Sequence, residues 1–186
     1  MNSMKVFLQT FGCQMNKLDS AIIETAMKEG GYQFVNNSKD ADIVLINTCS
    51  VREHAERRVI SNLGHLKYQK ETRPGLVVGV IGCMAQRMGE ELIKHPAVDI
   101  VCGPDAYRSL PHLLAIAGSA SDERVGIANV MLSVDETYAD IIPLRMDESK
   151  VGAWVSIMRG CNNMCSFCVV PFTRGRRFAR NVVLIP

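Results

Sequence analysis

The sequence has no run of apolar residues long enough to cross a membrane. A transmembrane helix needs roughly 20 consecutive apolar residues, and no stretch of this chain approaches that length. Residues 1–12 also lack the apolar core of a secretory signal. We therefore expect a cytoplasmic protein with no membrane partner, although a protein of an organelle matrix has the same features.

Acidic residues and lysine are missing from the last part of the chain. Residues 151–186 contain arginines but no lysine, aspartate or glutamate, whereas the whole chain has a formal net charge of only +2. A basic end of this kind is suited to RNA or to an anionic cofactor. A solvated arginine-rich tail has the same composition, so charge alone leaves both interpretations open.

The chain also lacks the even number of cysteines that a fully paired disulfide framework requires. It has 7 cysteines in 186 residues. Because thiols stay reduced in the cytosol, disulfides are not expected there, and metal binding or catalysis is the more natural use of so many cysteines.

Short apolar strands alternate with helical segments in the first two thirds of the sequence. The expected strands cover residues 5–11, 42–47, 76–81 and 98–101. Apolar residues recur at helical spacing between them, and Asn16 is placed to cap the first helix. This alternation is typical of an open parallel sheet, doubly wound and flavodoxin-like, with helices on both faces. The sequence thus predicts an α/β domain over residues 1–118.

Two further segments follow this domain. Residues 119–150 show weak periodicity and are predicted to be a linker with at most one hairpin. Residues 151–186 begin a new unit, in which an expected strand at 153–158 is followed by another cysteine, Cys161.

Three cysteines, Cys13, Cys49 and Cys83, each lie one or two residues beyond an expected strand. Because parallel strands end at the same edge of a sheet, where open α/β proteins bind ligands, we expect the three thiols to converge. Three thiolates without an obvious fourth ligand suit an iron–sulfur cluster with one open iron. Zinc would need a fourth ligand such as His54 or Cys102. Alternatively, the three cysteines are simply small buried side chains.

A second and more compact motif, C-x-x-x-C-x-x-C, is formed by Cys161, Cys165 and Cys168. So short a loop can give one thiolate to each of three irons of a cubane cluster and leave the fourth iron open to a substrate. A zinc knuckle and a redox C-x-x-C pair are the alternatives. No cysteine or histidine follows Cys168 to complete a zinc site.

The surroundings of both groups resemble the radical S-adenosylmethionine (SAM) enzymes, and in detail the tRNA methylthiotransferases of the MiaB type. The resemblance runs from residue 4 to about residue 176, and its motifs occur in the family's order. It is carried by residues 10–16, 47–52, 82–87, 103–105, 135–138 and 159–176.

The resemblance implies two [4Fe–4S] clusters and a radical SAM reaction. Cys161, Cys165 and Cys168 would hold the cluster that binds SAM, and Cys13, Cys49 and Cys83 the cluster that presents sulfur. The implied reaction is methylthiolation of N6-isopentenyladenosine beside the anticodon of tRNA. A reductant protein such as flavodoxin or ferredoxin would be a second partner. Phe167 would pack near the SAM adenine, with a plain core role as the alternative.

The end of the sequence departs from the family pattern. Family members continue past residue 176 with Glu-Arg-Ser-Arg, the rest of a partial β/α barrel and an RNA-binding domain. This chain instead has Arg-Phe-Ala-Arg at 177–180 and stops at Pro186. Because a barrel needs many more strands to enclose SAM and a base, we expect residues 151–186 to be the start of an incomplete radical SAM barrel. The short end is the one a truncation or a frameshift would give, and the chain alone is expected to be inactive.

Two other functions remain open at this point. One is a non-catalytic iron–sulfur or electron-transfer protein, and the other is a zinc-binding RNA adaptor that uses the basic end. Iron and acid-labile sulfide would separate the first from the second. SAM cleavage under reductant would separate the enzyme from the electron-transfer protein.

Overall fold

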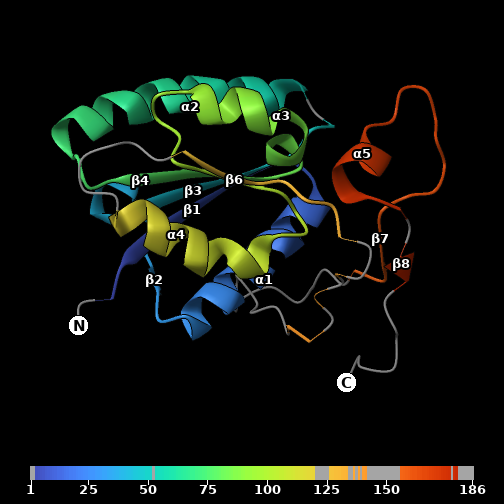
Figure 1. Cartoon of the computed structure of the whole chain (residues 1–186), viewed down its shortest axis with the longest axis horizontal. Coiled ribbons are helices and arrows are strands. Elements are labelled where there is room, and N and C mark those ends of the chain that lie inside the picture. The colour runs from blue at the N-terminus through green and yellow to red at the C-terminus, as the bar shows by residue number, and fades with distance from the viewer. Residues whose placement is uncertain are drawn as a thin grey trace.

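The computed structural model describes residues 3–51, 53–119, 126–133, 136, 138, 140–141, 156–176 and 178–179. A parallel sheet lies between two layers of helices (Figure 1). Its strands are β1 Lys5–Phe11, β2 Gln33–Phe34, β3 Ile43–Thr48, β4 Val77–Gly82, β5 Ile100–Cys102 and β6 Ile127–Asn129. The helices around it are α1 Gln14–Glu29, α2 Glu53–Thr72, α3 Cys83–Lys94 and α4 Leu110–Ser119, with 3-10 turns at Ser38–Asp40 and Tyr107–Ser109.

The strand order is β2-β1-β3-β4-β5-β6, and every neighbouring pair is parallel. The chain moves from β1 to β2 in one direction and then from β3 to β6 in the other, so the order reverses between β1 and β3. This reversal is the point at which doubly wound sheets bind ligands, outside the carboxyl ends of the strands. The predicted doubly wound, flavodoxin-like fold is confirmed.

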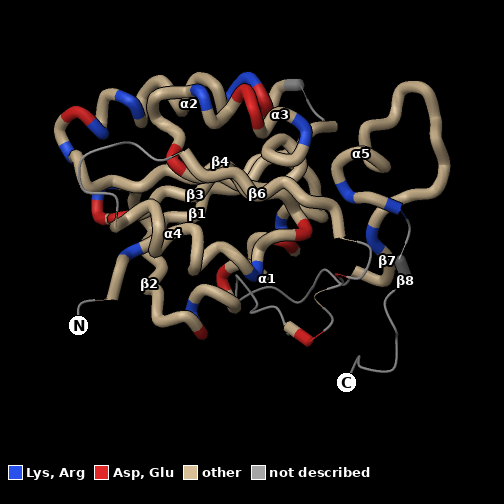
Figure 2. Tube along the Cα trace, viewed as in Figure 1, with Lys and Arg blue, Asp and Glu red and all other residues tan. Residues whose placement is uncertain are grey.

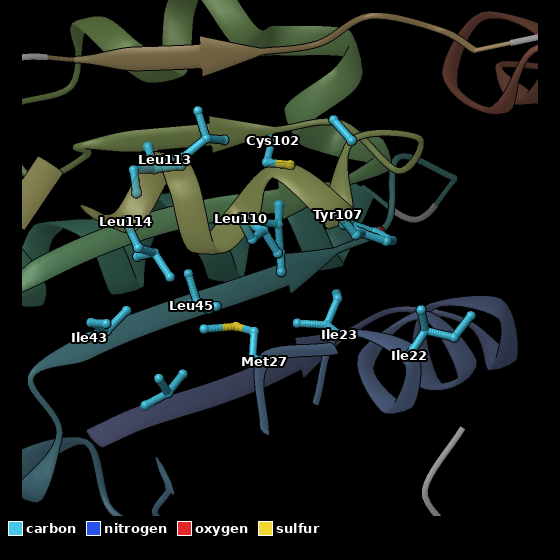
Figure 3. Close-up of a cluster of buried hydrophobic side chains, with 14 of the residues drawn as sticks. Ile22, Ile23, Met27, Ile43, Leu45, Cys102, Tyr107, Leu110, Leu113 and Leu114 are labelled. Atoms are coloured by element: carbon cyan, nitrogen blue, oxygen red, sulfur yellow. The ribbon is translucent and has the colours of Figure 1, made fainter. Parts of the chain in front are cut away.

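Alternating side chains of the central strands pack into two separate hydrophobic cores, one on each face of the sheet. Ile43 and Leu45 of β3 join the cluster beneath α1 and α4, which Figure 3 shows in close-up. Val44 and Ile46 of the same strand face the other way, toward the cluster beneath α2 and α3. Because both faces are buried, the strand sequence is continuously apolar instead of alternating.

The structure corrects the predicted linker at residues 119–150. Ile127–Asn129 pairs in parallel with β5 and extends the sheet past residue 118, the predicted end of the domain. Strand β2 was also missed. Strands of two or three residues carry too few side chains to show a period of two, which explains both omissions.

The cysteine-rich unit lies at one end of the sheet, drawn in red in Figure 1. It contains β7 Met158–Arg159, α5 Val170–Arg174 and β8 Phe178–Ala179, and β7 pairs with β8 in antiparallel fashion. The strand expected at 153–158 lies mostly outside the described residues, since 151–155 are not among them. Of the helices described, none has the length and apolar character needed to cross a bilayer.

Candidate functional site

Three neighbouring strands are each followed, within two residues, by a cysteine. Cys13 occupies the N-cap position of α1 after β1, Cys49 directly follows β3, and Cys83 begins α3 after β4. Since β1, β3 and β4 are adjacent, these three residues, here called the edge cysteines, share the carboxyl edge of the sheet at the point where the strand order reverses. This is the arrangement expected from the strand pattern.

Two glycines let the backbone approach closely at this edge. A Cβ on Gly12 would lie 2.4 Å from the Cβ of Cys49, and Gly12 has a φ of +142°. A Cβ on Gly82 would lie 2.4 Å from Asn47 Oδ1, and Gly82 has a φ of +92°. Both positions need glycine, because L-residues rarely adopt such φ values and have no room here for a side chain.

A buried pair of asparagines lies beside the edge cysteines and joins α1 to β3 through hydrogen bonds. Asn16 Nδ2 donates to Asn47 Oδ1 at 3.0 Å, and Asn47 Nδ2 donates to the Asn16 carbonyl and to Ser20 Oγ, both at 2.9 Å. The Sγ of Cys13 lies 3.2 Å from Asn16 Oδ1. The prediction that Asn16 caps the first helix is wrong, because α1 begins at Gln14 and Asn16 ties this helix to β3.

The thiols of Cys13 and Cys49 interact directly. Their hydrogen bond lowers the pKa of Cys13, while the same bond and burial raise the pKa of Cys49. The backbone N–H of Val51 donates to Cys49 Sγ at 3.3 Å. Backbone donors of this kind stabilise a sulfur that carries negative charge, whether in a thiolate or in a cluster ligand.

Cys83 is contacted by an arginine from the distant cysteine-rich unit. Arg174 Nε donates to Cys83 Sγ at 3.1 Å. Burial raises the pKa of the Cys83 thiol, and the guanidinium partly opposes that shift. Burial disfavours the charged form of Arg174, yet attraction to Asp19 and Cys83 raises the pKa of Arg174 well above its usual range. Arg174 therefore stays cationic beside the thiol.

The second group, here called the loop cysteines, consists of Cys161, Cys165 and Cys168. The backbone N–H of Cys161 donates to the Gly175 carbonyl at 3.1 Å and closes the base of the loop. Inside the loop, the N–H of Cys168 donates to the Cys165 carbonyl at 2.9 Å in a tight turn. Cys165 is exposed, while Cys161 and Cys168 are half-buried.

Phe167 lies in the turn between Cys165 and Cys168 and is 90% exposed. The alternative of a core role for Phe167 is therefore wrong for this chain. The proximity to SAM that the resemblance implies stays a prediction.

Asp19 anchors the loop, although no sequence pattern pointed to it. Arg174 forms a hydrogen-bonded ion pair with Asp19 of α1, and Arg159 lies 3.6 Å from the same carboxylate. A single aspartate on a helix gave no signal in the sequence. The alternative of a solvated arginine tail is wrong for these two residues, since Arg159 is 5% and Arg174 7% exposed. Figure 2 shows basic positions but no acidic ones in the described part of the cysteine-rich unit.

Within the described residues, neither suggested fourth ligand completes a metal-binding group with the edge cysteines. Cys102 is completely buried in the core beneath α4, as Figure 3 shows, and its Sγ contacts the Gly103 carbonyl. His54 lines a cleft of about 540 Å³ together with Phe11, Gly12 and Arg58. Within the part of the chain that the structure describes, no three His, Cys, Asp or Glu side chains form a group that could hold a metal ion.

The chemistry of the edge cysteines nevertheless fits thiolate ligation of a cluster. All seven cysteines are free thiols. Cys49 and Cys83 each have an N–H donor directed at sulfur. A cubane cluster distributes its thiolates over different irons, so its ligands surround it at separate corners and need not gather around one atom.

Comparisons with known proteins agree with the sequence motifs. Residues 5–103 match the model of "Uncharacterized protein family UPF0004". The human protein "Mitochondrial tRNA methylthiotransferase CDK5RAP1" is 48% identical over 97% of this chain and 30% of its own length. A protein of Chloroherpeton thalassium named "tRNA-2-methylthio-N(6)-dimethylallyladenosine synthase" is 48% identical over 97% of this chain and 39% of its own length. A Porphyromonas gingivalis protein of the same name is 45% identical over 96% of the chain and 38% of its own length.

The chain thus spans between 30% and 39% of the length of these curated relatives. The match to residues 5–103 covers more than half of the chain. The chain therefore belongs to the family UPF0004, and its predicted resemblance to tRNA methylthiotransferases is confirmed.

Proposed function

We propose that this chain supplies the cysteine sites of a radical SAM methylthiotransferase that modifies isopentenylated adenosine in tRNA. One observation carries the proposal: the edge cysteines share the carboxyl edge of the sheet where the strand order reverses, and Arg174 of the cysteine-rich unit contacts one of them, Cys83. The names of the relatives support the substrate and the reaction class.

The proposed cofactors are two [4Fe–4S] clusters and SAM. When bound by the loop cysteines, a cluster with an open iron supplies the reductive cleavage of SAM. The loop closed by Cys161 and Gly175 would present its thiols together, and the exposed Phe167 side chain would be available to the SAM adenine. The edge cysteines would hold the second cluster, with Val51 N–H and Arg174 stabilising its sulfur ligands.

The proposed partners are tRNA and an electron donor. Arg58 lines the cleft together with Gly12, the residue before Cys13, so a polyanion that approached Cys13 through this cleft would meet a guanidinium. A reductant protein such as flavodoxin or ferredoxin would supply the electron for SAM cleavage. We propose the cytoplasm as its compartment; the human relative is named as mitochondrial.

A chimera tests this function. Residues 4–176 would replace the matching part of the Chloroherpeton thalassium relative, in a bacterial strain that lacks its own enzyme. We expect 2-methylthio-N6-isopentenyladenosine in digested tRNA, and its loss when Cys161 or Cys49 is replaced by alanine.

If a folded chimera leaves the tRNA unmodified while the intact relative modifies it, the proposal is wrong. An electron-transfer role would give clusters that cycle between redox states without SAM cleavage.

A further inference from the structure

Four charged side chains are buried together where the cysteine-rich unit meets the α/β domain. Asp19 is 0% exposed, and Arg159 and Arg174 are 5% and 7% exposed. Arg159 also reaches Asp105, with Nη2 3.2 Å from Oδ1, and donates to the Pro104 carbonyl at 3.1 Å. Two acidic and two basic groups thus balance each other. Buried charges are stable only when paired in this way.

Asp19 is the centre of this network. Its Oδ2 accepts hydrogen bonds from Arg174 and, at 3.2 Å, from the hydroxyl of Tyr107, while its Oδ1 lies 3.6 Å from Arg159 Nη1. The side chain of Tyr107 is itself 1% exposed. The Asp19 carboxylate therefore faces both arginines of the cysteine-rich unit. A buried tyrosine of the α/β domain, Tyr107, also donates a hydrogen bond to it.

The helix that carries Asp19 also carries one of the edge cysteines. Cys13 caps α1, and Asn16, between the two, fixes this helix to β3. The helical rise puts Cys13 and Asp19 about 9 Å apart along the axis. A change in the place of Asp19 would therefore move an edge cysteine with it.

The two arginines stand on either side of the loop cysteines. Arg159 belongs to β7, just before Cys161, and Arg174 is the last residue of α5, just after the loop. The two ends of the loop are joined by the bond from Cys161 N–H to the Gly175 carbonyl. Binding both arginines to one carboxylate fixes the whole loop as a unit, because both of its ends are held.

We propose that Asp19 is a positioning residue that fixes the loop cysteines beside the edge cysteines. The importance of this docking for catalysis rests on the proposed function, in which the loop cysteines and the edge cysteines must act on the same base. The docking itself requires no bound cofactor, since every contact is made by this chain's own side chains. Asp19→Asn would keep the shape but remove the anion that the two buried arginines share, so that Arg174 loses its carboxylate and Arg159 keeps only Asp105. The expected response is release of residues 156–176 into water, where the arginines are solvated.

Hydrogen exchange of the reduced, cluster-free chain tests the docking. In Asp19→Asn we expect the amides of Cys161, Phe172 and Thr173, which are hydrogen-bonded in the structure, to exchange at least about tenfold faster. Exchange in β3 and β4 should stay unchanged. The matched control is Asp99→Asn. Asp99 is also buried and also paired with a cation, Lys70, but it directly precedes β5, at the opposite end of this strand from its carboxyl edge. It should leave exchange in residues 156–176 at the wild-type rate.

Thiol reactivity gives a readout that simple destabilisation would not reproduce. Cys83 should react with N-ethylmaleimide at least about tenfold faster in Asp19→Asn, because Arg174 no longer covers it, whereas Cys102 in the core should keep its rate. Arg174→Gln should reproduce the effect, and Arg174→Lys, which keeps the charge, should retain most of the protection. In the double variant Asp19→Asn/Arg174→Gln the two effects should not add.

Unchanged exchange in residues 156–176 of Asp19→Asn would overturn the proposal. If Asp19→Asn loses protection from hydrogen exchange throughout the sheet, the docking is tested with Arg159→Gln/Arg174→Gln instead, because this variant alters no residue of the α/β domain. Faster exchange confined to residues 156–176 would then support the proposal, and wild-type rates there would refute it. No cluster is present in these experiments. A failure of the chain to bind iron would therefore count against the proposed function but would not affect the test of docking by Asp19.

Discussion

The edge cysteines come from three strand ends separated by whole helices, whereas the loop cysteines lie within residues 161–168. In the first group, positions are set by the sheet, by close-packed glycines and by the pair Asn16–Asn47. In the second group, the spacing is local, but its place relative to the domain depends on two buried arginines. The edge site therefore shares the stability of the fold, while the loop site needs the fold only for its location.

The largest loss of stability should follow from adding a side chain at the closely packed carboxyl edge of the sheet. Gly82→Ala places a Cβ 2.4 Å from Asn47 Oδ1 and 2.9 Å from the Thr48 carbonyl, at a φ of +92°. We expect a loss of about 3–5 kcal/mol in the free energy of unfolding, measured by urea denaturation followed by circular dichroism.

The matched control is Gly64→Ala, in the middle of α2 with open space around it. It should raise stability by about 0.5–1 kcal/mol, because alanine favours a helix. A loss below about 1 kcal/mol for Gly82→Ala would show that the edge is less tightly packed than described.

A smaller loss should follow from removing the polar support of the edge. Asn47→Ala deletes three buried hydrogen bonds to Asn16 and Ser20 and leaves their groups unpaired. We expect a cost of about 2–3 kcal/mol in the same unfolding experiment. Asn62→Ala, which removes one half-buried bond to Gln9, should cost only about 1 kcal/mol. Equal losses of unfolding free energy in Asn47→Ala and Asn62→Ala would show that the buried asparagine pair stabilises the edge no more than a half-buried hydrogen bond does.

The smallest effect on stability is expected from a substitution in the turn between Cys165 and Cys168. Phe167→Ala removes a side chain that is 90% exposed, so the free energy of unfolding should change by no more than about 0.5 kcal/mol. A loss of about 2 kcal/mol or more, typical of a core aromatic, would contradict the exposed position. If Phe167 contacts SAM as proposed, the same variant should weaken SAM binding to the reconstituted chain, measured by equilibrium dialysis.

The sequence predicted the parts of the molecule that have a local pattern. Four strands were found from apolar runs, and both cysteine groups from their spacing, because strand ends and loop motifs leave a direct trace in the sequence. The short strands β2 and β6 and the role of Asn16 escaped prediction, because they depend on contacts with segments far along the chain.

The anchor at Asp19 could not be predicted for the same reason. Asp19 and Arg174 are 155 residues apart in sequence, and charged residues on a helix usually face solvent. Only the folded chain reveals that this carboxylate is buried and shared by two arginines.

Iron and acid-labile sulfide analysis tests the central claim, that both cysteine groups hold clusters, most directly. After anaerobic reconstitution, the wild-type chain should contain about eight irons, with about four in Cys161→Ala/Cys165→Ala/Cys168→Ala and about four in Cys13→Ala/Cys49→Ala/Cys83→Ala. Iron that is unchanged by either triple substitution, or zinc retained in place of iron, would contradict the claim.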